Sequence, residues 1–169
     1  IELKRRSMKT LRKRKWLDDD IINSYIVCLQ RRDMDMCDGD IERKPSHFFN
    51  THFYSKLTNP EFTYSDIKKW GEKCKGSNIF DLKYLVVPIN IGNRHWTCAI
   101  VFMEENKIVY YDSLPTGDQD ELMKPILDYL SYECQDKLGR DFDASQWTFE
   151  FGNTPQQKNN CDCGVFVCM

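Results

Sequence analysis

Apolar residues recur every three or four positions in the first part of the chain, which is the period of an amphipathic helix. The first stripe follows three aspartates, whose charge favours the N-terminal end of a helix dipole, and predicts a helix over residues 18–29. A second stripe over residues 48–57 ends before Asn59-Pro60. Ser65 is expected to cap a third, short helix that runs to Cys74. Polar residues around Asp38-Gly39-Asp40 predict a loop between the first two stripes.

The middle of the chain has a different pattern. β-Branched and aromatic residues are concentrated in three runs bounded by turn signals, which predict strands at residues 84–89, 95–102 and 107–112. A helical stripe follows at residues 120–134, and a further short strand at 147–151. Helices first, then strands, then one helix and one strand predict an α+β fold and not a regular βαβ succession.

Two of these strands bring a histidine and an aspartate into register. If residues 103–106 form a four-residue hairpin loop, Thr97 lies opposite Asp112, and His95 is a diagonal neighbour of Asp112 on the same face. Their Cβ atoms are then roughly 7 Å apart. A single bulge would reverse this parity. Taken separately, a strand histidine is more often structural, and an aspartate at a strand end is more often a turn residue.

A cysteine near the end of the chain completes a candidate catalytic group. Cys163 follows a turn-like Asn-Asn-Cys-Asp run and precedes apolar residues, which suits the first turn of a buried helix. The positive end of a helix lowers the pKa of a thiol placed there. A thiol nucleophile also needs a base, a group that orients the base, and an oxyanion donor; His95, Asp112 and Gln157 can fill these roles.

Length and composition limit the alternatives. A chain of 169 residues suits one domain with a substantial core, and no apolar run approaches the roughly 20 residues that span a bilayer. Eight irregularly spaced cysteines without a signal-peptide-like start predict free thiols in a reducing, intracellular compartment. Cys161 and Cys168 are expected to be core residues. Together with Cys163 they are an alternative set of metal ligands, but a fourth ligand at finger-like spacing is missing, so we expect no metal and no cofactor.

The first 15 residues form a basic arm, with eight lysines and arginines against one acidic residue, although the net charge of the chain is −2. A solvated face or flexible lead-in is one interpretation of this arm, and a nuclear-import signal or nucleic-acid patch is the other. The sequence does not decide between them. We expect a nuclear protein without a nucleic-acid partner.

Four ordered segments resemble the catalytic domain of the Ulp and sentrin-protease (SENP) family of cysteine proteases, which process and deconjugate SUMO. They are WLDDDIINSY at 16–25, VPINIGNRHW at 87–96, YYDS at 110–113 and PQQKNNCDCGVFVC at 155–168. The resemblance runs from about Trp16 to Cys168. It implies a papain-like cysteine protease fold, with a central mixed β-sheet flanked by helices, and a catalytic domain over residues 16–169 that follows the arm at 1–15.

The resemblance also implies roles for individual residues. His95 is the general base and later the acid, Asp112 orients it, and Cys163 is the nucleophile. The side-chain amide of Gln157 joins the backbone N–H of the nucleophile in the oxyanion hole, while its neighbour Gln156 does not.

For substrate binding, Trp16 and Trp96 match two tryptophans that cover the Gly-Gly tail of the modifier. Two indoles make a slot that admits only residues without a Cβ, and two core tryptophans are the alternative. Asp19 matches an aspartate that contacts the modifier. Asp18 stands where many members have asparagine and adds a negative charge nearby.

The expected function is that of a SUMO-specific cysteine protease whose partners are SUMO and SUMO-conjugated proteins, with no membrane partner. Action on another ubiquitin-like modifier, acyl transfer, and a non-catalytic binding module are the alternatives. The complete set of candidate catalytic residues argues against a pure binding module. The family continues the helix that carries the nucleophile beyond the position of Met169, so we expect a domain truncated at its C-terminus.

Overall fold

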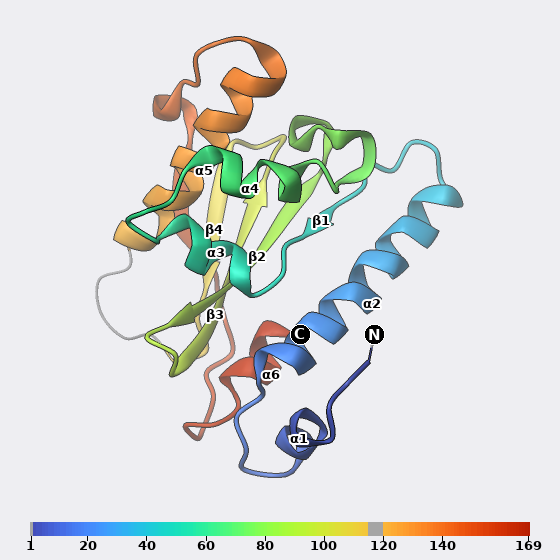
Figure 1. Cartoon of the computed structure of the whole chain (residues 1–169), viewed down its shortest axis with the longest axis vertical. Helices are drawn as coiled ribbons and strands as arrows, with labels where there is room; N and C mark the ends of the chain where they lie inside the picture. Colours follow the sequence, from blue (N-terminus) through green and yellow to red (C-terminus); the bar gives the residue numbers. More distant parts are fainter. Residues whose placement is uncertain (1, 115–119) are drawn as a thin grey trace.

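A mixed β-sheet forms the centre of the computed structural model, which describes residues 2–114 and 120–169 (Figure 1). Its strands lie in the order β1-β2-β3-β4-β5. They are β1 (His47–Phe48), β2 (Tyr84–Ile91), β3 (His95–Phe102), β4 (Lys107–Tyr111) and β5 (Thr148–Phe151). β2, β3 and β4 are antiparallel, whereas β1 and β5 pair in parallel at the two edges. The predicted α+β class and central mixed sheet are confirmed.

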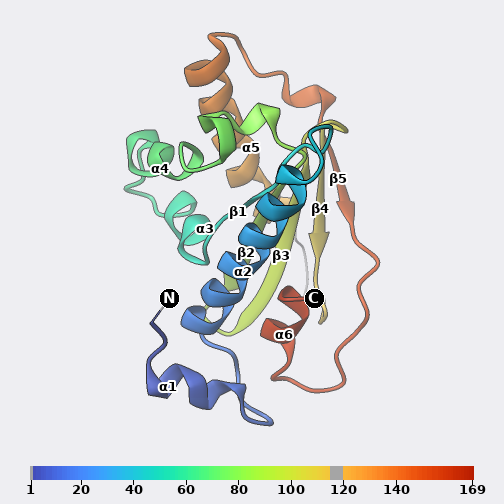
Figure 2. The same cartoon turned by 90° about the vertical axis from the view of Figure 1, so that its right-hand side faces the viewer.

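Helices cover both faces of this sheet (Figures 1 and 2). One core contains Ala99 and Val101 of β3 together with side chains from α3 (His52–Leu57), α4 (Tyr64–Gly71) and α5 (Asp120–Leu138). Trp96 has the opposite parity on β3, and it packs with α2 (Asp19–Asp38) and α6 (Cys163–Val167). Since side chains alternate along a strand, these two clusters lie on opposite faces.

The hairpin between β3 and β4 has the predicted register. Phe102 pairs with Lys107 and Cys98 with Tyr111, so the ladder stops one step before Thr97 and Asp112. No bulge interrupts the paired residues, and the parity inferred for Asp112 is therefore preserved.

The end of α2 differs from the sequence prediction. The helix continues past Leu29 to Asp38 because its additional turns are bound to the neighbouring chain by polar side chains. The Gln30 side chain donates to the carbonyl of Ser46 (2.9 Å) and accepts from the N–H of Phe48 (3.0 Å). Buried Asp33 accepts from the N–H of Ser46 at 2.6 Å. The spacing of apolar residues, from which the end of the helix was predicted, carries no information about such polar contacts.

The next two helices are shorter than predicted. The stripe over residues 48–57 is divided, because Phe48 belongs to β1 and only His52–Leu57 is helical. α4 ends at Gly71, before Cys74, and its N-cap is Thr63 and not Ser65. The Asp66 carboxylate accepts from both the N–H and the hydroxyl of Thr63, each at 3.0 Å. Thr63 and Asp66 thus form a capping box, which fixes the start of the helix after Thr63.

Part of the basic arm is helical and contacts the rest of the chain. α1 (Arg5–Met8) continues into a 3₁₀ turn, η1 (Lys9–Leu11). Ser7 is fully buried and donates to the Asp20 carboxylate of α2 at 2.8 Å. Over residues 2–114 and 120–169, no helix combines the length and apolarity needed to cross a membrane. Each of the eight cysteines is a free thiol.

Candidate active site

His95 and Asp112 meet at one end of the β3–β4 hairpin. His95 is the first residue of β3, and Asp112 directly follows β4. The Nε2 atom of His95 lies 2.6 Å from Oδ1 of Asp112, as the diagonal register predicts. Only 15% of the His95 side chain and 3% of the Asp112 side chain are exposed. Shielding from water strengthens the interaction between an imidazole and a carboxylate.

The orientation of the imidazole determines which nitrogen takes part in chemistry. The Asp112 carboxylate engages Nε2, so Nδ1 is the ring nitrogen that remains for exchanging a proton with a thiol. The carboxylate is itself held in place: Oδ1 accepts from the N–H of Leu114 at 2.8 Å, and the Asp112 carbonyl accepts from the side chain of Gln156 at 3.2 Å. A carboxylate in this position selects one tautomer and stabilises the imidazolium.

Cys163 is the first residue of α6 and is 2% exposed. α6 packs on β3, and Cys163 belongs to the same apolar cluster as Trp96, the neighbour of His95. Gly164 permits this approach, since a Cβ there would lie 2.9 Å from Cβ of Leu17 and 3.4 Å from Cδ1 of Trp96. The close packing of α6 therefore places the thiol beside the strand that carries the histidine.

The three cysteines of this segment are not equivalent. Burial, assisted by the Asp162 carboxylate, raises the pKa of Cys161, and burial raises the pKa of Cys168 to about 11. Both therefore stay protonated at neutral pH, when only a thiolate is a good nucleophile. In the part of the chain that the structure describes, no three His, Cys, Asp or Glu side chains are grouped to hold a metal ion, so the zinc interpretation of these cysteines gains no support.

Gln157 is buried in the loop that leads to α6. Its Oε1 accepts from the hydroxyl of Ser113 at 2.8 Å, and its backbone N–H donates to the Ser113 carbonyl at 2.9 Å. Nε2 donates one of its two N–H groups to the carbonyl of Asn159 at 2.5 Å. The second N–H of the amide is a further donor. Sequence reasoning missed the supporting roles of Ser113 and Gln156, although both residues lie inside the segments that it singled out.

The two tryptophans and Asp19 line one surface depression of about 420 Å³. Trp96 is 7% exposed, and its indole N–H donates to the carbonyl of Leu17 at 3.1 Å. Trp16 is 46% exposed and is therefore not a core residue. The structure thus brings the three predicted substrate-binding residues to the same depression. One of them, Trp96, directly follows His95 in the sequence.

A histidine–aspartate pair at the start of a strand, and a cysteine at the start of a helix that packs on that strand, are the elements expected of a cysteine protease. The Ulp1 protease family, C-terminal catalytic domain, matches residues 15–169. The chain belongs to this family.

Individual members of the Ulp1 family are similar over most of the chain. The ubiquitin-like-specific protease ESD4 of Arabidopsis thaliana is 34% identical over 160 residues, which are 90% of this chain and 31% of the relative. The crystal structure of a de-sumoylating protease superposes with a TM-score of 0.81 at 28% identity. The match covers 98% of this chain and 64% of the chain of that protease. The X-ray structure of the C-terminal Ulp1 protease domain in complex with Smt3, the yeast ortholog of SUMO, has a TM-score of 0.75 at 29% identity. The match covers 96% of this chain and 67% of that chain. The chain spans less than half the length of the curated relatives it matches.

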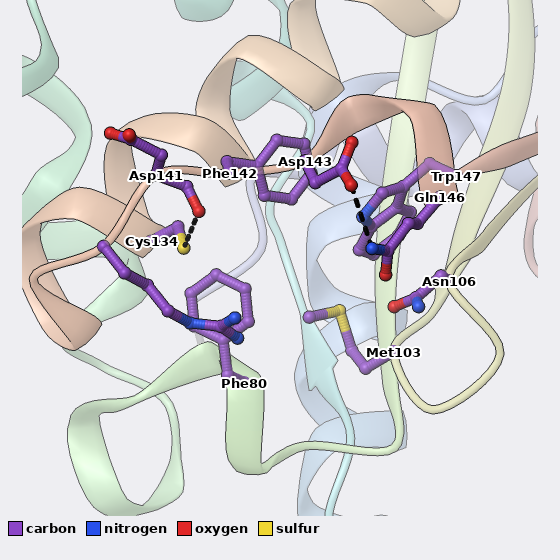
Figure 3. A pocket seen from close by; sticks show the side chains of 10 residues that line it. Phe80, Met103, Asn106, Cys134, Asp141, Phe142, Asp143, Gln146 and Trp147 are labelled. Carbon is purple, nitrogen blue, oxygen red and sulfur yellow. Dashed lines mark hydrogen bonds between the residues drawn. The ribbon is translucent and has the colours of Figure 1, made fainter.

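Figure 3 shows the residues that line a second cavity, of about 140 Å³. Met103, which directly follows β3, is one of them, so the cavity lies at the end of β3 opposite His95. Met103 and Asn106 of the hairpin loop and the segment after α5 line it, with Phe142 and Trp147 as a tilted aromatic pair. The Asp143 carboxylate accepts from the Gln146 side chain there at 2.9 Å. The whole length of β3 separates this cavity from the Ulp1-type site, so we assign it no part in catalysis.

Proposed function

We propose that this chain is the catalytic domain of a SUMO-specific cysteine protease. It hydrolyses the bond after the C-terminal Gly-Gly of SUMO, both in precursors and in isopeptide-linked conjugates. The observation that carries the proposal is the shielded 2.6 Å contact of His95 with Asp112, at the start of a strand against which the helix beginning with Cys163 packs. Family membership and the similarity to a protease domain in complex with Smt3 support the choice of modifier. The proposed domain spans residues 16–169, after the arm at 1–15.

In the proposed mechanism, His95 Nδ1 accepts the thiol proton of Cys163, and the thiolate sulfur attacks the carbonyl carbon of the terminal glycine. The backbone N–H of Cys163, at a helix start where N–H groups have no helical partner, and the Gln157 amide stabilise the oxyanion. His95 then returns the proton to the leaving amine, and a thioester remains on the sulfur. Water, deprotonated by His95, hydrolyses the thioester and regenerates the thiol.

A panel of probes tests the proposed function. SUMO, ubiquitin and a further ubiquitin-like protein, each bearing a C-terminal thiol trap, are incubated with the chain, and the adducts are resolved by mass. We expect selective labelling by the SUMO probe. Labelling by another modifier alone would overturn the assignment of SUMO, and absence of labelling by all three would overturn the assignment of a protease.

Replacing the Gly-Gly tail of the substrate by Gly-Ala is expected to reduce turnover by about 10²-fold, because a methyl between two indoles displaces the scissile carbonyl. Turnover of SUMO precursors with either tail measures the effect, and KM should change less than kcat. Trp96→Ala should reduce the difference in kcat between the Gly-Gly and the Gly-Ala substrate. If the unmodified chain hydrolysed the two substrates at equal rates, Trp16 and Trp96 would not form a slot for the tail and would have structural roles only.

Gln157→Ala is expected to lower kcat on the order of 10²-fold through the loss of one oxyanion donor. Ser113→Ala is the matched control, since it removes the hydrogen bond at Oε1 but leaves the amide N–H groups in place. We expect its kcat to fall less than tenfold. Comparable losses in the two variants, at equal melting temperatures, would show that Gln157 acts only as a support of the loop.

We also propose that the protein acts in the nucleus. The basic side chains of the arm support this location, because Arg12, Lys13, Arg14 and Lys15 form an exposed cationic run. The distribution of a fluorescent fusion, with and without neutralisation of this run, tests the proposal. An unchanged cytoplasmic distribution of both fusions would contradict it.

A further inference from the structure

The basic arm is anchored to α2 by a buried hydrogen bond. Ser7 of α1 is fully buried, and its hydroxyl donates to the Asp20 carboxylate at 2.8 Å. The Ser7 carbonyl accepts from the hydroxyl of Thr10 at 2.7 Å, which links this anchor to η1. Leu3 packs against the apolar cluster between α2 and α6, and α1 lies beside the start of α2 (Figures 1 and 2). The arm is therefore part of the packed molecule and not a free lead-in.

Residues 8–15 connect the Ser7 anchor to Trp16 through a tight turn. The N–H of Lys15 donates to the carbonyl of Arg12 at 3.2 Å. Between them, Arg14 has a φ of 60°, a left-handed conformation that is uncommon for a residue with a Cβ. A residue keeps such a conformation where the structure around it imposes it. Here the Ser7 anchor lies on one side of the turn and α2 on the other, so the anchor helps to fix the direction in which the chain reaches Trp16.

Trp16 and Leu17, which follow this turn, are held in different ways. Leu17 is buried, its carbonyl accepts from the indole N–H of Trp96, and its Cβ would lie 2.9 Å from a Cβ added at Gly164. Leu17 is thus fixed by β3 and α6. Trp16 is 46% exposed, and within residues 2–114 and 120–169 its indole makes no hydrogen bond. The position of Trp16 therefore depends on the backbone that carries it, which includes the turn of the arm.

We infer that Ser7 is a positioning residue for the tail slot, because its hydrogen bond to Asp20 holds the turn of the arm and the turn holds Trp16 in the depression that it shares with Trp96. This inference rests on the proposed function. Loss of the Ser7 hydroxyl loosens the arm from α2, Trp16 follows, and the slot widens. A wider slot discriminates less against a residue with a Cβ. A general loss of stability, in contrast, lowers the concentration of active chain equally for every substrate.

Tail selectivity, defined as kcat/KM for a SUMO precursor ending in Gly-Gly divided by kcat/KM for one ending in Gly-Ala, tests this inference. In Ser7→Ala we expect the selectivity to fall about three- to ten-fold, because a hydrogen bond to a charged group is one of the stronger kinds. Alanine favours a helix, so α1 should still form. Ser24→Ala is the matched control. The Ser24 hydroxyl donates to the backbone carbonyl of Asp20 at 2.7 Å, within α2, and its removal should leave the selectivity unchanged.

Substitutions of Asp20 separate the hydrogen bond from other effects of Ser7. Asp20→Asn keeps an oxygen that accepts from the Ser7 hydroxyl, so its selectivity should stay within about twofold of the unmodified chain. In an Asp20→Ala background, Ser7→Ala should cause no further loss of selectivity, because the acceptor is already absent. Unchanged selectivity in Ser7→Ala, or a full further loss in the Asp20→Ala background, would overturn the inference, and the proposed function would stand if the unmodified chain cleaves SUMO. If the unmodified chain fails to cleave SUMO, both are overturned.

Discussion

Cys163→Ser will reduce cleavage of SUMO by about four orders of magnitude or more, because removal of a catalytic nucleophile leaves only binding and oxyanion stabilisation. A serine hydroxyl is far less acidic than a thiol, so the imidazole of His95 generates little alkoxide at neutral pH. Single-turnover cleavage of a SUMO precursor measures the loss. The fold is expected to be retained, since the substitution preserves the size of a side chain that is 2% exposed.

Cys161→Ser is the matched control for this variant. Cys161 lies two residues earlier, and its raised pKa makes it a poor nucleophile, so we expect nearly normal cleavage. Mass mapping of a covalent SUMO probe adds an independent readout. Attachment of the probe to Cys161 or Cys168 in the unmodified chain would disprove the assignment of Cys163.

Asp112→Asn is expected to lower kcat by roughly 10³- to 10⁴-fold while the fold persists. The asparagine keeps one oxygen, which can still accept from the N–H of Leu114, but it has no negative charge to stabilise the imidazolium of His95. An amide directed at Nε2 also favours the wrong tautomer. The measurement is kcat for a SUMO precursor, with circular dichroism and melting temperature to establish folding.

Glu104→Gln controls for the loss of one negative charge at a site remote from chemistry. Glu104 lies in the β3–β4 loop and forms an exposed ion pair with Lys44 at 2.8 Å. We expect kcat within about twofold of the unmodified chain, because exposed pairs contribute little. A folded Asp112→Asn protein with a kcat close to that of Glu104→Gln would mean that Asp112 does not orient the catalytic histidine.

The contact between His95 and Asp112 was predictable from the sequence because a hairpin is a local structure. Runs of β-branched and aromatic residues specify the two strands, and the four-residue loop at 103–106 sets the register between them. Once that register is set, the position of Asp112 relative to His95 follows from strand geometry alone. The start of α2 was equally local, since Asp18 caps the helix within a single turn.

Other features depend on contacts between distant segments, which periodicity does not encode. α2 extends beyond Leu29 because Asp33 binds Ser46, and His52 lies beside Asp19 because Asn23 binds Thr51. These side chains are polar, so they do not contribute to the apolar pattern, and nothing in that pattern indicates which distant residue each of them binds.

The motif around Cys163 indicated the candidate thiol, and local sequence also predicted the helix start at which the structure places it. Its place beside β3 is a property of the tertiary structure, since it requires Gly164 to fit against Leu17 and Trp96, which are far away in sequence. The sequence by itself indicated the candidate catalytic side chains and the hairpin that brings His95 and Asp112 together, because the relation between these two residues is short-range. Only long-range packing decided that the helix that begins with Cys163 lies against the strand that begins with His95.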